Sequence, residues 1–118
     1  MGPIIISAEL TATNADILSG TRLETAPANG VMTFEMQSAD SIAANNYVAT
    51  LQLPDGDVPM NGVLVPGTDT AGLTGILRDT NKLMLSVPVS QGGHVVFGLT
   101  ETGDTECIYR VTFTPLKR

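Results

Sequence analysis

Apolar and polar residues alternate along much of the chain. The clearest example is the stretch from residue 4 to 13, IIISAELTAT, in which every second residue is apolar. A period of two is typical of a β-strand that buries one face and exposes the other. The same alternation returns in VMTFEMQ, YVATLQL, GVLV, KLMLSVPV, HVVFGLT and CIYRVTFT. The pattern therefore predicts a chain built of short strands.

Turn signals rich in glycine separate these segments. They are PANG at 27–30, PDGD at 54–57, MNG at 60–62, QGG at 91–93 and ETGDTE at 101–106. Glycine accepts a positive φ at low cost, and Asn-Gly and Asp-Gly are common hairpin turns. We therefore predict an all-β fold, an antiparallel β-sandwich or jelly-roll-like barrel of about seven or eight short strands. Residues 82–114 are predicted to form a three-stranded meander.

Three local features refine this prediction. Pro88 lies inside a predicted strand and cannot donate a ladder hydrogen bond, so that strand is expected at an edge or with a bulge. Residues 13–20 do not alternate, and Asn14 and Gly20 could cap and end one helical turn. Residues 38–46 could make another such turn. Neither stretch is long enough for a helix that is stable alone.

The length of 118 residues predicts one domain, residues 1–118, with residues 1–13 as an N-terminal strand or arm. Ile4, Ile5 and Ile6 stand near the end of the chain, where sequences are usually polar. A terminus with such high β propensity either pairs within its own sheet or adds to the sheet of a neighbour. An ordinary first strand and an oligomer interface therefore both stay open for these isoleucines. The chain has no tryptophan and few other aromatic residues, so self-association would add stability.

The net charge of −6 narrows the choice of partners. Phosphate contacts need clustered lysine and arginine, which disfavours nucleic acid, and an anionic membrane surface is disfavoured for the same reason. No apolar run approaches the length of about 18 residues expected of a membrane-spanning helix. The start, MGPIIISAEL, lacks the basic segment of a signal peptide. We expect a soluble protein that is made in a cytoplasm.

Residues that could carry chemistry are few. His94 and Cys107 are the single histidine and the single cysteine, so no intrachain disulfide forms, and zinc lacks its usual number of ligands. With a nearby acid the pair could form a triad. However, Cys107 begins the register of a predicted core strand, and His94 follows a glycine turn. We therefore expect neither catalytic residues nor a cofactor, and the chain is not expected to be an enzyme.

Two further stretches could bind something. Asp55 and Asp57 in PDGD place two carboxylates near each other, which suits either calcium or a tight turn, and the rest of a calcium-binding loop is missing. GVLVPGTDTAGLTG, residues 62–75, is too polar for a core and predicts a long exposed loop. A partner-contact role is predicted for part of this loop. The residues are Pro66, Thr68, Asp69 and Leu73.

Residues 17–114 resemble small structural proteins encoded by tailed phages, especially those of marine phage genomes. The resemblance rests on GTRL followed by PANG, on LQLPDGD, on QGGH and on the closing YRVTFTP. It implies a virion component, a capsid decoration or stabilising protein that assembles as a homotrimer on a capsid lattice. It brings no catalytic residue. The alternative is a small module that binds a host protein or a small ligand, such as a phage-encoded inhibitor.

Overall fold

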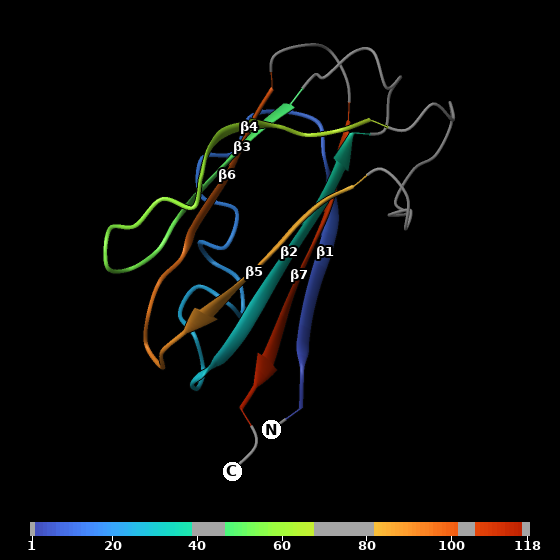
Figure 1. The fold of residues 1–118 in the computed structure, drawn as a ribbon. Coiled ribbons are helices and arrows are strands. Elements are labelled where there is room, and N and C mark those ends of the chain that lie inside the picture. The colour runs from blue at the N-terminus through green and yellow to red at the C-terminus, as the bar shows by residue number, and fades with distance from the viewer. Residues whose placement is uncertain (1, 39–46, 68–81, 102–105, 117–118) are drawn as a thin grey trace.

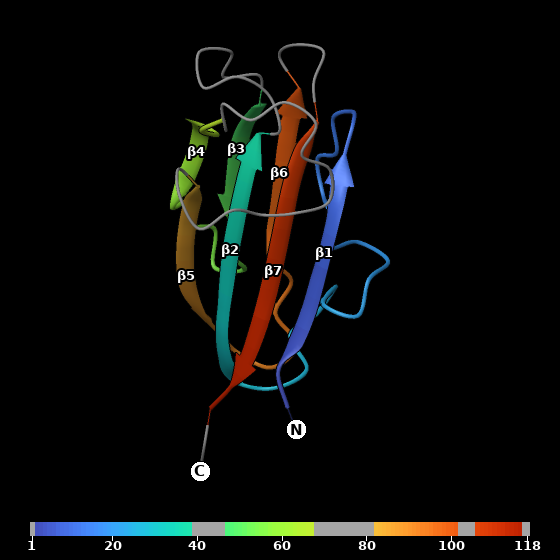
Figure 2. The same cartoon turned by 90° about the vertical axis from the view of Figure 1, so that its right-hand side faces the viewer.

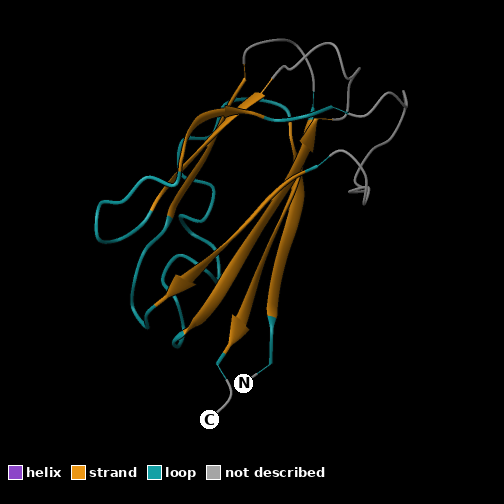
Figure 3. Ribbon diagram, in the orientation of Figure 1, coloured by secondary structure: helices purple, strands orange, loops and turns teal. Residues whose placement is uncertain are grey.

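The computed structural model describes residues 2–38, 47–67, 82–101 and 106–116. These residues form strands and loops without a helix, so none of them forms a helix that could cross a membrane (Figure 3). The strands are β1 (Ile4–Leu10), β2 (Gly30–Ser38), β3 (Tyr47–Gln52), β4 (Met60–Leu64), β5 (Leu83–Val89), β6 (Val96–Glu101) and β7 (Cys107–Pro115). The prediction of an all-β chain of about seven or eight strands is confirmed.

The strands form two antiparallel sheets. The four-stranded sheet has the order β1-β7-β2-β5, and the three-stranded sheet has the order β4-β3-β6. Figure 1 shows the two layers from the side, and Figure 2 looks onto the four-stranded sheet with the other sheet behind it. The start of β1 and the end of β7 lie at the same end of the sandwich (Figure 2). The sequence predicted either a sandwich or a barrel. The described strands form two separate sheets, so the architecture is a sandwich.

The predicted meander of residues 82–114 is wrong. β5 pairs with β2, β6 pairs with β3, and β7 pairs with both β1 and β2. The chain therefore crosses from one sheet to the other between β5 and β6, and crosses back between β6 and β7. The local turn signals that suit a hairpin also suit a connection between sheets, and the partners of these strands lie far away in the sequence. Pro88 does lie in an edge strand, β5, as predicted.

The space between the sheets is filled by the apolar positions that the alternation predicts. Met32, Phe34 and Met36 of β2 are buried there together with Val111 and Phe113 of β7. The odd positions of β5 pack against the same core, together with Ile4, Ile6 and Leu10 of β1, while Ala8 is exposed. β3 and β5 thus alternate between inward and outward positions, as a period of two requires, whereas the second half of β2 is buried at every position.

Three aromatic rings join the two sheets. Phe97 of β6 lies with its ring centre 5.1 Å from that of Phe34 on β2, and 6.1 Å from that of Tyr109 on β7. The rings meet in tilted and edge-to-face arrangements, which aromatic pairs favour. Phe97 is fully buried, so this ring of the three-stranded sheet packs between the two sheets against aromatic rings of β2 and β7.

The MNG segment is not the turn that its sequence predicts. Met60, Asn61 and Gly62 lie inside β4, and Gly62 has a φ of 68°. The register against β3 shifts between Ala49 and Thr50, opposite this glycine. The Asn-Gly pair therefore forms a β-bulge in an edge strand, where a positive φ is as useful as in a turn.

Residues 14–20 make turns instead of a helix. The side chain of Asn14 accepts a hydrogen bond from the backbone N–H of Asp16 at 3.1 Å, and Gly20 has a φ of 79°. Asn14 and Gly20 thus begin and end this segment, as predicted. Ile17 and Leu18, between them, are buried in the core. The other predicted helical turn falls mainly on residues 39–46, outside the described residues.

We predict that Phe97→Ala lowers the free energy of unfolding by about 3–5 kcal/mol, because it removes the ring that fills the centre of both sheets. Urea unfolding followed by circular dichroism measures the change. Thr100→Ala, at an exposed position of the same strand, is the control and should change stability by less than about 0.5 kcal/mol. Equal effects of the two substitutions would contradict this description of the core.

Candidate functional site

The outward face of the four-stranded sheet carries side chains in rows that run across the strands. Cross-strand neighbours lie about 5 Å apart and can interact directly. One row is Ser7, Arg110, Glu35 and Met84, and the next is Ile5, Thr112, Thr33 and Ser86. The centre of each row is polar, and an apolar side chain stands at one end.

A carboxylate with two cations lies in the middle of the first row. Glu35 of β2 accepts hydrogen bonds from Arg110 of β7, Nε to Oε1 at 2.8 Å and Nη2 to Oε2 at 3.0 Å. Lys82, directly before β5, donates from Nζ to Oε2 at 2.5 Å. Arg110 and Lys82 hold the pKa of Glu35 at about 2 although burial acts to raise it. This cluster ties β7, β2 and the start of β5 together.

The cluster could not be found from the sequence alone. Glu35 and Arg110 stand at polar positions of two alternating segments, which is a weak signal of an outward face. Their pairing depends on β2 and β7 being neighbours, and those strands are separated by most of the chain. A fold with another strand order would leave both charges in solvent.

The predicted interface residues Ile4, Ile5 and Ile6 fall into two groups. Ile4 and Ile6 point inward and pack against the core, so they act as part of an ordinary first strand. Ile5 points outward and is 60% exposed, and Met84 at the opposite edge of the sheet is 56% exposed. Large apolar side chains thus remain in solvent at both edges of this face.

The three-stranded sheet also exposes apolar side chains. On its edge strand β4, Leu64 is 55% exposed and Val63 lies beside it, also exposed. Leu64 of β4 lies opposite Val48 of β3, which is only partly buried. Both outward faces of the sandwich therefore offer apolar contact surface.

His94 connects two loops at one side of the sandwich. Its Nε2 lies 2.9 Å from Oδ2 of Asp16, and its Nδ1 bonds the backbone carbonyl of Glu24. Because both ring nitrogens face oxygen acceptors, both must carry a proton to donate, and the ring is favoured as imidazolium. The Glu24 carbonyl and then the Asp16 carboxylate raise the pKa of His94.

The His94 and Cys107 pair does not form a catalytic arrangement. Cys107 is fully buried, and burial raises the pKa of its thiol to about 12, so the reactive thiolate does not form at neutral pH. The ring nitrogens of His94 are taken up by Asp16 and Glu24. Both residues thus have the structural roles that the sequence analysis favours.

Asp55 shapes the turn between β3 and β4. Its Oδ1 accepts the backbone N–H of Asp57 at 3.0 Å, and Gly56 between them has a φ of 95°. The backbone closes the turn with a hydrogen bond from Leu53 to Asp57 at 2.8 Å. Within the described part of the chain, histidine, cysteine and carboxylate side chains do not gather in groups of three or more that could hold a metal ion.

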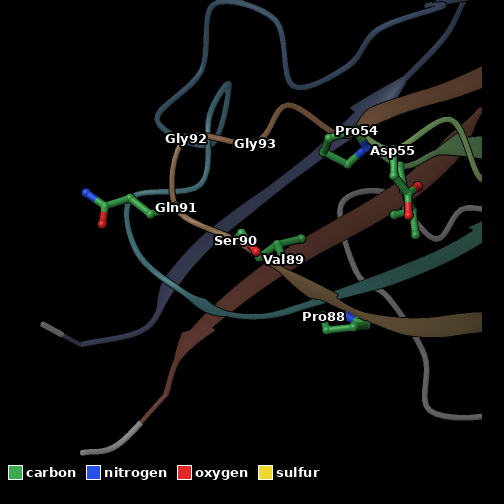
Figure 4. A pocket seen from close by; sticks show the side chains of 9 residues that line it. Pro54, Asp55, Pro88, Val89, Ser90, Gln91, Gly92 and Gly93 are labelled. Atoms are coloured by element: carbon green, nitrogen blue, oxygen red, sulfur yellow. The ribbon is translucent and has the colours of Figure 1, made fainter.

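A pocket of about 420 Å³ lies between this turn and the turn that follows β5. Figure 4 shows Pro54 and Asp55 on one side and the segment from Pro88 to Gly93 on the other. A Cβ atom on Gly93 would come within 3.0 Å of the Pro54 ring, so glycine allows the two turns to approach closely. The polar side chains in the lining are few, with Asp55, Ser90 and Gln91 as the main ones.

The predicted partner-contact loop lies largely outside the described residues. Thr68, Asp69 and Leu73 lie outside the described residues. Pro66 is partly buried, and its carbonyl accepts the backbone N–H of Ser38 at 2.9 Å. Gly67 forms a parallel bridge with Ser38. The loop therefore starts at the end of β2, on the central part of the four-stranded sheet.

Comparison with known proteins gives no family: no family model matches this chain, and no curated protein matches it. Among solved structures it is similar to the C-terminal CBM6 of LamC, a marine laminarinase from Zobellia galactanivorans, with 15% identity, a TM-score of 0.48 and coverage of 95% of this chain and 98% of that one. It is also similar to the acidic stable capsid of Helicobacter pylori bacteriophage KHP30, with 10% identity, a TM-score of 0.46 and coverage of 97% and 88%. Likenesses this distant transfer no function.

We predict that Glu35→Gln lowers the free energy of unfolding at pH 7 by roughly 1–3 kcal/mol, because it removes the charge-assisted bonds to Arg110 and Lys82. The pKa of Glu35 is lowered from 4.5 to about 2, so its contribution is complete above pH 4.5 and is lost as the pH falls through about 2. Urea unfolding should show the two proteins converging over that range. Thr114→Ala, on the same face, should leave stability unchanged at every pH, and a pH-independent deficit in Glu35→Gln would contradict the ion-pair account.

We also predict that the contribution of His94 to stability falls as the pH rises above about 6.5. Its folded pKa is raised above 6.5, so the stabilising charge is complete below pH 6.5 and is lost as the pH rises through the folded pKa. Urea midpoints of the wild type and His94→Gln, measured from acidic to alkaline pH, isolate this contribution because all other groups are shared. The difference between the two proteins should be largest at the acidic end. Parallel curves would contradict the imidazolium contact.

Proposed function

We propose that this protein is a non-catalytic structural domain that associates with copies of itself and with a repeating protein surface. The observation that supports this most is the exposure of large apolar side chains on both outward faces of the sandwich. Ile5 and Met84 lie on one face, and Leu64 lies on the other. A domain that packs against neighbours on two sides gains from such surfaces, because burying them drives association.

The roles of the ionisable side chains support a non-catalytic function. Glu35 is neutralised by two cations, His94 joins two loops, and Asp55 caps a turn. Cys107 is buried in the core. Catalysis requires groups that face a substrate with a suitably placed partner, and each of these four is already used by the fold.

The finer part of the proposal is a capsid decoration or stabilising protein, located in the virion. It is supported by the resemblance of residues 17–114 to structural proteins of tailed phages. The proposed partners are copies of the chain, as a homotrimer, and a capsid protein lattice. The loop that starts at Pro66 is proposed to contact that lattice.

A module that binds a small ligand or a host protein is the second candidate. The pocket between the two turns favours it, because concave sites with a few polar groups are the usual form of small-ligand sites. Its polar groups lie on loops at one end of the sandwich and do not involve either outward face. A binding module of this kind would have no need of self-association.

Light scattering on a sizing column, at two protein concentrations, distinguishes the two candidates. We predict a mass of three copies of the 12.3-kDa chain at both concentrations. The mass should persist at about 1 M salt, because apolar contacts are not screened as charged contacts are. A monomer at both concentrations would contradict the structural role and favour the binding module.

A further inference from the structure

A sheet ends in edge strands whose backbone groups can pair with another chain, and natural proteins protect such edges. The described strands give four of them, β1 and β5 in one sheet and β4 and β6 in the other. β5 is protected by Pro88, which offers no N–H. β4 is protected by the bulge at Gly62, which twists the strand out of register.

The edge of β6 is covered by the chain itself. Asn14 and Leu99 exchange backbone hydrogen bonds of 3.0 and 2.9 Å, and the N–H of Ile17 donates to the carbonyl of Phe97 at 2.8 Å. The segment from Asn14 to Ile17 therefore lies along β6 and occupies part of its edge, with an isolated bridge between Asn14 and Leu99. Among the described strands, the edge of β5 is thus protected by a proline, that of β4 by a bulge and that of β6 by a neighbouring segment of the chain.

β1 has none of these devices. Its pairing with β7 runs without interruption from Ile4 opposite Phe113 to Leu10 opposite Cys107, and it contains neither proline nor lysine. Among the described residues, the carbonyl of Leu10, at the end of β1, accepts a hydrogen bond from the Tyr47 hydroxyl at 3.1 Å. A strand rich in isoleucine with a free edge is an effective template for strand addition.

Charge divides this edge into two halves. Glu9 lies outward in the second half and shares a hydrogen bond with Glu106, which raises the pKa of Glu9. Two acids beside each other repel another acidic chain. The first half, residues 4–7, follows Pro3 and has no charged side chain, and its outward apolar residue is Ile5.

We propose that residues 4–6 of β1 pair antiparallel with the same residues of a second copy, around a two-fold axis at Ile5. The partner is thus a second copy of this chain, and the contact joins two four-stranded sheets into one. Ile5 faces Ile5 of the second copy on the outward side, and Ile4 faces Ile6 of the second copy on the core side. Such an isologous contact satisfies both edges at once.

The outward face selects this register. Residues directly opposite in an antiparallel pair lie on the same face, so Ile5 must face an outward residue. An axis at Ser7 would place Ile5 against Glu9, and an axis at Ile6 would place it against Ser7. The axis at Ile5 buries isoleucine on isoleucine and leaves Glu9 beyond the paired segment.

This inference rests on the proposed role as a self-associating structural domain and adds a second kind of contact to it. A two-fold contact joins two copies, so within a shell it would link one trimer to the next. The paired segment is short and buries little surface, which predicts weak association that depends on concentration. A covalent trap is therefore a better test than the native mass.

The test is disulfide formation under mild oxidation in Ile5→Cys, with Ser7→Cys as the matched control on the same strand and face. Antiparallel neighbours have Cα atoms about 4.5–5.5 Å apart, within the range that a disulfide bridges. We expect Ile5→Cys to form a cross-linked dimer at least 10-fold faster than Ser7→Cys. Thr100→Cys, exposed on the other sheet, reports collisions, and the buried Cys107 reports the background in the wild type.

Each outcome decides the proposal. A fast cross-link in Ile5→Cys alone supports the pairing and its register. A faster cross-link in Ser7→Cys overturns the register, and equal slow rates in all three variants overturn the contact. The native mass of the wild type still decides on self-association in that last case, so a failure of this contact is distinguishable from a failure of the proposed function.

Discussion

The antiparallel pairing of β2 with β7 is the contact on which the rest of the structure depends. It runs over nine residues, from Gly30 opposite Pro115 to Ser38 opposite Cys107, in the middle of the larger sheet. This register directs the buried aromatic side chains inward and joins Glu35 to Arg110 outside. A slip by one residue would exchange the two faces, exposing the core and burying the charges. β1 and β5 add to this pair on either side, so their faces follow from it.

Alternation predicted which segments are strands and most of the residues they bury, because a period of two reflects a local property of the chain. It did not predict that Ala8 is exposed or that Glu35 and Gln37 are buried. It did not predict pairing. The strands of residues 82–114 follow each other in sequence but join different partners, since a turn does not record whether the next strand stays in the same sheet. The bulge at Gly62 was mistaken for a turn for a related reason: positive φ is needed in both, and only the register against β3 distinguishes them.

The roles of individual side chains were likewise predictable only where they depend on neighbours in the sequence. The sequence indicated correctly that Cys107 packs in the core and that Asp55 belongs to a turn, because both depend on neighbours in the chain. The contacts of Glu35 with Arg110 and of His94 with Asp16 join residues more than seventy positions apart. They require the strand order and so stayed hidden. Because these charged groups stabilise the fold, the proposed contacts with partners rest on the exposed apolar side chains and on the edge of β1.

Amide hydrogen exchange at β1, followed by NMR in dilute and in concentrated protein, tests most directly whether its free edge is a contact surface. In dilute protein the amides that point away from β7 should exchange quickly, because among the described residues they have no backbone partner. The account predicts that those between Ile4 and Ser7 become protected on concentration, while amides at the edges of β4 and β5 keep their rates. Fast exchange at both concentrations, or new protection at β4 or β5 instead, would contradict it.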